Sequence, residues 1–287
     1  MQFNLYNDIK SFYKDVYDVL MRHESQNMIP LGNVIIGHTG TDKTGWRDAA
    51  NWLMATVSDD TGIRLTGVMT PPHQLTLYAT DNHVDAAALA CLVEGMIDTR
   101  FSVPGVMSEK TLAEQFAKTY AVAKGVGYII QKSMRLYELS RVNPDIPNVG
   151  DVRSARESDM AFLPYWIEGF GRDCQVPHRM NLDGENARYE VAAKRMYVLE
   201  DNGTPVSIAK ITRDLQTVCG IGHVYTPPYF RGKGYATSCV AAVSRLMLER
   251  GFTKCILYTD LANPTSNSIY QKIGYTPISD ASEIVFE

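Results

Sequence analysis

A glycine-bearing loop joins an apolar strand to an amphipathic helix in the C-terminal half of this chain, and this order limits the folds that the region can adopt. Residues 218–225 have the composition of a strand, residues 237–250 have the apolar spacing of a helix, and the sequence RGKGYA at 231–236 joins them. The first amides of a helix lack partners within it and point outward at the positive end of its dipole. Glycines let phosphate oxygens approach such amides, and Arg231 and Lys233 add positive charge. This order predicts a site for a phosphorylated cofactor.

The whole-chain composition is that of an ordinary globular protein. The length of 287 residues suggests about two domains, 45% of residues are hydrophobic, and a net charge of −4 favours no nucleic-acid partner. The five cysteines are scattered without C-x-x-C spacing, so we expect neither a metal site nor a disulfide framework. The start of the chain has no secretory pattern, and no apolar run could span a bilayer. We therefore expect a soluble, cytoplasmic protein with no membrane partner.

Two domains are expected on either side of a linker. Residues 142–151 hold two prolines and a glycine between two periodic segments. We therefore predict an N-terminal α/β domain over residues 1–143 and a second domain over residues 150–287, with a mixed sheet of the α+β kind. The second domain is expected to contain a helix capped at Ser158-Asp159, strands at 194–199, 205–212, 218–225 and 254–260, a helix at 264–273, and a final strand pair or hairpin at 276–286.

The first domain shows a similar order of elements. After helical residues 5–22 we expect strands at 52–57, 63–69 and 74–79 and a helix at 84–97. At the position of the glycine loop stands Thr80-Asp81-Asn82-His83, which has no glycine and carries an acid, so we expect it to hold no phosphate. The shared order leaves two interpretations open, a degenerate duplication and a chance similarity of short α/β segments.

Residues 151–287 resemble the GNAT superfamily, whose members transfer an acyl group from acyl-coenzyme A to an amine. The family signature [Q/R]-x-x-G-x-[G/A] stands here as Arg231, Gly234 and Ala236. Residues 260–275 (DLANPTSNSIYQKIGY) resemble the second hallmark, a strand end with Asn followed by a short helix that closes in Tyr and Gly-Tyr. The sequence is similar to those of a bacterial branch of predicted acetyltransferases that have an extra N-terminal domain. The resemblance implies a GNAT fold and an acetyl-CoA-dependent N-acetyltransferase.

The resemblance also implies roles for individual residues. The N–H of Val224 would polarise the thioester carbonyl, that of Thr226 would hold pantetheine, and Tyr270 would protonate the leaving thiolate. A bulge would splay the strand that carries Val224 from its neighbour. The full set implied for coenzyme A is Val224, Tyr225, Thr226, Arg231, Gly232, Lys233, Gly234, Tyr235, Ala236, Thr237, Asn263, Ser266, Asn267 and Tyr270. For Tyr270 the rival role is packing of the helix end, and for Asn263 it is a local turn cap.

The sequence leaves the identity of the general base open. Gly220 stands where some family members carry a glutamate, and His223 is the substitute that the sequence offers. Regular alternation places His223 on the face opposite Val224, unless a bulge re-aims the imidazole. A water chain or a carboxylate among Asp183, Glu185 and Glu190 could also serve as base, and an amine that binds neutral would need none.

The acceptor and the class of function are open as well. We expect a small-molecule amine as acceptor, with a protein lysine as the rival substrate, and a non-catalytic coenzyme A sensor or scaffold as the rival class. Residues 37–44 (GHTGTDKT) nearly match a nucleotide-binding P-loop, but Asp42 replaces its second glycine. A polar loop before a helix is the favoured interpretation of that segment.

Overall fold

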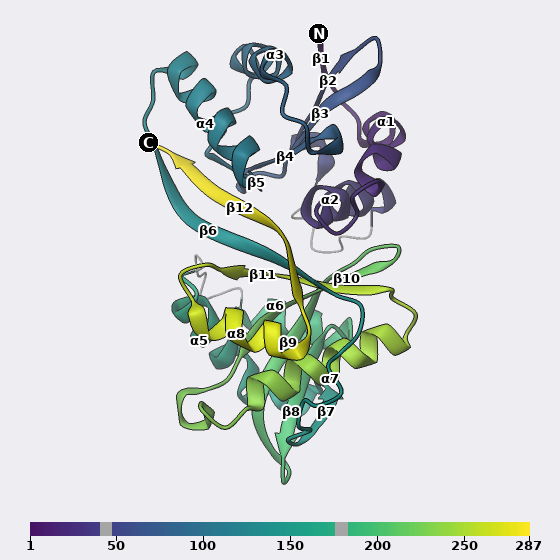
Figure 1. Ribbon diagram of the computed structural model, residues 1–287, viewed down its shortest axis with the longest axis vertical. Coiled ribbons are helices and arrows are strands. Elements are labelled where there is room, and N and C mark those ends of the chain that lie inside the picture. The colour runs from purple at the N-terminus through teal and green to yellow at the C-terminus, as the bar shows by residue number, and fades with distance from the viewer. Residues whose placement is uncertain (41–47, 176–182) are drawn as a thin grey trace. The chain divides into compact units, whose positions relative to one another are not determined.

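The computed structural model describes residues 1–40, 48–175 and 183–287, and these form two compact units (Figure 1). Unit 1 comprises Met1–Leu136, Asp260–Ala262 and Ile278–Glu287; unit 2 comprises Tyr137–Thr259 and Asn263–Pro277. Strands β6 (Tyr128–Leu139) and β12 (Thr276–Phe286) each run through a boundary between the units. The last ten residues therefore group with unit 1, although the linker pattern predicted contiguous domains.

Unit 2 contains a mixed sheet with strand order β11-β10-β9-β8-β7. Strands β7 (Asp151–Ser154), β8 (Met196–Asp201), β9 (Thr204–Asp214) and β10 (Val218–Tyr225) are antiparallel to their neighbours, whereas β10 and β11 (Lys254–Asp260) are parallel. The hairpin between β8 and β9 turns at Asn202 and Gly203, which both have positive φ, as the Asn-Gly pair predicts.

Helices cover both faces of the unit 2 sheet because successive strand side chains point to opposite sides. Tyr197 and Leu199 pack with α7 (Tyr235–Glu249) and α8 (Pro264–Ile273), which lie side by side (Figure 1). Met196 and Val198 pack instead with residues of α5 (Leu163–Asp173) and α6 (Asp183–Ala192). We refer to these as the α7/α8 face and the α5/α6 face.

Unit 1 has the same kind of architecture. Its sheet has the order β1-β2-β3-β4-β5-β12, formed by β1 (Gln2–Leu5), β2 (Leu53–Asp59), β3 (Gly62–Met69), β4 (Leu75–Ala79), β5 (Gly105–Glu109) and the end of β12. Helices α3 (Ala86–Ile97) and α4 (Lys110–Lys124) pack on one core with strand side chains such as Leu53 and Leu65. Helices α1 (Ile9–Met21) and α2 (Met28–Thr39) also pack on β3.

The two units repeat one topology. The order β1-α1-α2-β2-β3-β4-α3-β5-α4-β6 returns as β7-α5-α6-β8-β9-β10-α7-β11-α8-β12. The pairing sense agrees as well, since β1–β2 and β7–β8 are antiparallel, whereas β4–β5 and β10–β11 are parallel. Agreement in order and in pairing favours a degenerate copy over chance similarity.

Several local predictions were wrong. Residues 276–286 form one strand instead of a strand pair or hairpin. The helix expected within residues 5–22 is present as α1, and only its start differs, because it begins at Ile9 after β1. The helix predicted from Ser158-Asp159 is a short 3₁₀ helix, Glu157–Ala161, followed by α5. Of the segment that nearly matches a P-loop, residues 37–39 end α2, and residues 41–47 lie outside the described part of the chain. No helix in the described ranges is long and apolar enough to cross a membrane.

Candidate functional site

A bulge near the end of β10 is the centre of the candidate site. The register between β10 and β9 slips between Gly222 and Tyr225, so the two residues between them have no Cα partner in β9. One of these, His223, has a φ of 48°, in the left-handed region that is uncommon for a residue other than glycine. The bulge that the family resemblance implied is therefore present, and it is centred on His223 and Val224.

Strands β10 and β11 separate before this bulge. Their parallel hydrogen-bonded ladder joins Val218–Gly220 to Lys254–Ile256. Both strands are described in full, and the ladder between them does not continue toward Tyr225. A strand that has left its neighbour keeps amides and carbonyls that can pair with an extended ligand. The end of β10 thus has the geometry for holding a chain that carries amide groups.

The bulge changes which face each side chain occupies. Ile221 and Val224 pack on the α7/α8 face, whereas the His223 ring stacks on Phe170 of α5 at 4.7 Å between centroids, and Tyr225 joins the α5/α6 core. Regular alternation would place Ile221 and His223 together and Val224 opposite. The bulge puts His223 on the face opposite Ile221, and it leaves His223 on the face opposite Val224, where alternation had placed it.

The glycine loop leads into an open helix N-terminus. Gly232 and Gly234 have φ values of 76° and 81°, which favour glycine, and a Cβ built on either would meet nothing within 4 Å. Gly234 is the N-cap of α7, and among the described residues no side-chain cap hydrogen bond forms there. The amides of Tyr235, Ala236 and Thr237 therefore form the first turn of an uncapped helix, as an anion site requires.

The two basic side chains of the loop occupy different positions. Nε of Arg231 donates to the Thr226 carbonyl at 2.8 Å, and its Nη2 donates to the Asp173 carboxylate at 2.5 Å. The guanidinium thus links the end of β10 to the end of α5. Lys233 is exposed, and its ammonium lies 6.0 Å from the centre of the Phe230 ring. Of the two, only Lys233 extends from the loop without an ion pair among the described residues.

Helix α8 brings the polar residues of the second motif close to one another. The Asn263 side chain accepts from the Ser266 N–H at 3.0 Å, so this residue does act as a cap. The Asn267 side chain donates to the Asn263 carbonyl at 2.8 Å and accepts from the Tyr137 hydroxyl at 3.0 Å. These contacts hold the first turn of α8 in place.

Tyr270 lies one turn further along α8 and is buried. Its ring centre is 6.0 Å from that of Tyr275 and 6.4 Å from that of Tyr137. Burial raises the pKa of Tyr270 above the ordinary value for tyrosine, and the neighbouring Cys174 thiol adds to this effect. The phenol therefore stays protonated at neutral pH, as a proton donor must.

His223 has the opposite kind of shift. Burial and the positive charge of Lys210 lower its pKa to about 3. Its imidazole is therefore neutral at physiological pH, and its basicity is low. A group with this pKa is a weak proton acceptor.

The three carboxylates that could act as base lie on α6. Glu190 forms a 2.5 Å ion pair with Lys210 of β9, and its Oε2 is buried without a partner in the described part of the chain. Lys210 stands opposite Gly222 in the register, which puts this pair next to the bulge. Glu185 is exposed, and Asp183 is the first residue of the helix.

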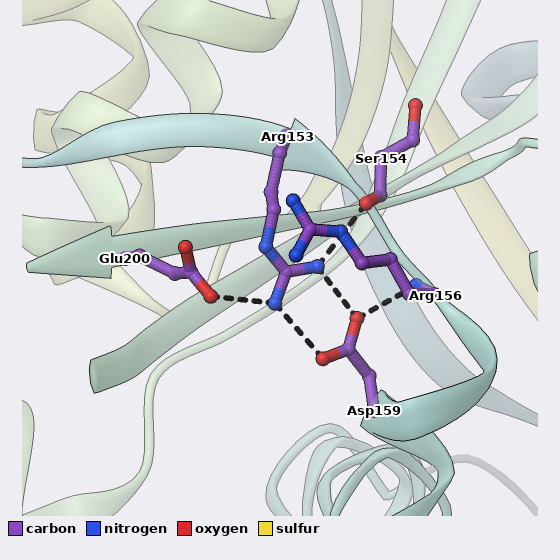
Figure 2. A network of polar contacts seen from close by, with 5 residues as sticks. All are labelled: Arg153, Ser154, Arg156, Asp159 and Glu200. Carbon is purple, nitrogen blue, oxygen red and sulfur yellow. Dashed lines mark hydrogen bonds and ion pairs between the residues drawn. The ribbon is translucent and has the colours of Figure 1, made fainter. Parts of the chain in front are cut away.

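A partly buried arginine network holds the residues before α5, and no sequence pattern indicated it. Figure 2 shows the Arg153 guanidinium between Asp159 and Glu200, with bonds of 2.6 and 2.9 Å to Asp159 and 2.6 Å to Glu200. The Arg156 N–H donates to Asp159 at 2.7 Å. Although burial alone would raise the pKa of Asp159, these hydrogen bonds lower it below the usual range. The network ties β7 and β8 to the turn before α5, which carries Phe170 and Asp173.

Comparison with known proteins identifies a family for the region that holds this site. Residues 162–275 match the sequence model of the acetyltransferase (GNAT) family. An acetyltransferase from the GNAT family of Colwellia psychrerythraea has a similar structure, with a TM-score of 0.62 and 12% identity over 100% of this chain and 99% of that one. A GCN5-related N-acetyltransferase from Sphaerobacter thermophilus has a TM-score of 0.62 and 14% identity over 99% and 95%.

A Drosophila protein has the same fold, with a TM-score of 0.66 and 14% identity over 99% of this chain and 98% of that one. At these identities the likeness concerns the fold alone, and it extends over both units. No curated protein matches the chain in sequence.

Proposed function

Residues 162–275 form a domain of the acetyltransferase (GNAT) family, and from this premise we propose that the chain is an acetyl-CoA-dependent N-acetyltransferase acting on a primary amine of a small molecule. One observation carries the proposal: the splayed, bulged end of β10 is followed directly by the uncapped, glycine-bearing N-terminus of α7. The first can pair with the amides of pantetheine, and the second can hold the pyrophosphate to which pantetheine is attached.

In the proposed reaction the amine nitrogen attacks the thioester carbonyl carbon, and the carbon–sulfur bond then breaks. The Val224 N–H donates to the oxygen that becomes negative, because the bulge releases this residue from its pairing with β9. The Tyr270 hydroxyl donates its proton to the leaving thiolate, and burial keeps that hydroxyl protonated until then. The products are the N-acetylated amine and free coenzyme A.

Other residues bind and orient the cofactor. The amides from Gly232 to Thr237 hold the pyrophosphate, Lys233 supplies charge, and Asn263, Ser266 and Asn267 border the pantetheine arm. Arg231 acts through Thr226 and Asp173, since its guanidinium binds both. His223 holds α5 against the bulge through Phe170, and its low basicity argues against a role as base. An amine that binds neutral can release its proton to water after attack, and water can return a proton to the Tyr270 phenolate, whose pKa is raised.

Acetyl-CoA turnover over a panel of small amines tests the proposal. Release of free thiol above the rate without amine is the expected result. Binding of coenzyme A without turnover on any amine would favour the rival class, a non-catalytic sensor or scaffold. Turnover with a lysine-containing peptide and with none of the small amines would identify a protein substrate.

A further inference from the structure

A single aromatic side chain next to the glycine loop stands almost entirely in solvent. Tyr229 is 85% exposed, more than any other large apolar side chain in the described ranges. The other aromatic residues around the loop are covered: Tyr225 and Tyr235 are 8% exposed, and Phe230 packs against the α7/α8 core. The exposed ring therefore contributes nothing to the core and is available to a ligand.

The backbone that carries Tyr229 is held firmly. It lies in the 3₁₀ helix Pro228–Phe230, which begins after Pro227 at a φ of −54°. The Phe230 N–H donates to the Pro227 carbonyl at 2.9 Å, and the Arg231 N–H donates to the Pro228 carbonyl at 3.3 Å. The Tyr229 ring touches Phe230 edge-on at 6.3 Å between centroids. A ring on a fixed turn loses little conformational freedom when it binds.

The position of the ring matches the shape of the cofactor. Tyr229 is three residues before Gly232, so the two lie within about 10 Å along the chain. In coenzyme A the adenine is separated from the pyrophosphate by one ribose, which also carries a phosphate. A purine attached through one ribose to a pyrophosphate at the glycine loop would thus be within reach of Tyr229, and the exposed Lys233 of the same loop offers positive charge for the ribose phosphate. Aromatic side chains bind bases through their faces.

We propose that Tyr229 forms the purine subsite of the coenzyme A site by stacking on the adenine ring. This inference rests on the proposed function, because it takes the pyrophosphate to lie at the glycine loop. The subsite binds the nucleotide end of the cofactor and leaves the acyl end untouched. Tyr229 thus contributes to affinity and to the choice of coenzyme A over shorter pantetheine thioesters.

Calorimetric titration with two probes tests this subsite. Coenzyme A carries the adenine, whereas 4′-phosphopantetheine lacks it. Tyr229→Ala should weaken coenzyme A binding about tenfold, the usual value of one stacked base, and leave phosphopantetheine binding unchanged. Tyr229→Phe, which keeps the ring, should bind coenzyme A within about twofold of the unchanged chain. Adenosine 3′,5′-bisphosphate, which carries the base without pantetheine, should lose affinity in Tyr229→Ala as coenzyme A does.

Tyr165→Ala is the matched control, since Tyr165 of α5 is also largely exposed, at 71%. It should leave the affinities for coenzyme A and for adenosine 3′,5′-bisphosphate unchanged. Unchanged coenzyme A affinity in Tyr229→Ala, or an equal loss for both probes, would overturn the purine subsite and leave the proposed function standing. If the unchanged chain binds no coenzyme A, the proposed function fails and this inference fails with it.

Discussion

The turn after β4 in unit 1 and the loop after β10 in unit 2 occupy the same place in one topology, yet only the second can hold an anion. In unit 1 the N-cap of α3 is Asp85, whose carboxylate accepts from the N–H groups of Ala87 and Ala88 at 2.8 and 3.2 Å. In unit 2 the N-cap of α7 is Gly234, which has no side chain to cap the helix, and no other described side chain forms a cap hydrogen bond there. A helix end that carries its own negative charge repels a phosphate, whereas an uncapped end attracts one.

The strands before these turns differ in the same direction. β4 pairs with β3 in one unbroken register from Leu65–Ala79 to Met69–Leu75, whereas β10 slips twice against β9. The helices α4 and α8 both end at a left-handed glycine that bonds back four residues, Gly125 to Ala121 and Gly274 to Tyr270. Tyr270 of unit 2 thus corresponds to Ala121 of unit 1. Unit 1 has a side-chain cap where unit 2 has an open helix end, and it has neither the bulge nor the phenol, so the same fold exists without the site.

Removing the phenol should have the largest effect. Tyr270→Phe removes the hydroxyl and leaves an apolar side chain, as unit 1 has with Ala121 at the corresponding position. We expect acetyl-CoA turnover to fall on the order of 10³-fold, with coenzyme A affinity unchanged. The control Tyr275→Phe removes a hydroxyl that bonds Ser244 at 2.9 Å, so it should reduce stability more than turnover. Thiol release and calorimetry measure both quantities, and full turnover in Tyr270→Phe would exclude Tyr270 as the acid.

Giving unit 2 the cap of unit 1 should have the next largest effect. In Gly234→Asp a carboxylate would lie at the open end of α7, and coenzyme A should bind about 100-fold more weakly. Gly234→Asn has a similar size and backbone cost without the charge, so its loss should be clearly smaller. Equal losses in calorimetry would mean that space, and not charge, decides binding.

The bulge residue should make stability depend on pH. The pKa of His223 is lowered to about 3, whereas the unfolded chain protonates this ring near 6.5. The stabilisation that comes from keeping His223 neutral is complete above pH 6.5 and is lost as the pH falls toward 3. The free energy of unfolding should therefore decrease by about 2 kcal/mol between pH 7 and pH 5.

His223→Gln should remove this pH dependence and keep turnover within about tenfold, because a ring of low basicity is a poor base. Chemical denaturation at several pH values measures the difference, and an NMR titration should show no protonation of His223 between pH 8 and 5. Protonation near pH 6.5 would contradict the burial of the ring.

The cap of unit 1 should have the smallest effect. Asp85→Ala removes two hydrogen bonds at the start of α3 and should lower the free energy of unfolding by about 1 kcal/mol. Coenzyme A should still bind at one site per chain, since β4 has no bulge and its turn has no glycine. A second binding event in calorimetry would show that the cap alone blocks unit 1.

Much of the fold was predictable from periodicity and turn chemistry. Strand β10 begins and ends with its apolar run. Helix α8 begins at Pro264 and is followed by Gly274, as these two residues indicate in the sequence. The predictions that were wrong depended on distant partners. The start of α5 is held by Arg153, Asp159 and Glu200, and Glu200 is 47 residues from Arg153 in sequence.

The glycine loop, the amphipathic helix behind it and the Asn-to-Tyr segment of α8 can be read from the chain alone, because these depend on local φ angles, caps and side-chain spacing. The tertiary structure decided the rest. The pairing with β9 shows that the bulge falls at His223 and Val224. The contacts with α5 show that the imidazole stacks on Phe170 and that Arg231 binds Asp173. It also assigned the last ten residues to unit 1 through their pairing with β5. Register and ion pairs join residues that are far apart along the chain, so no local pattern contains them.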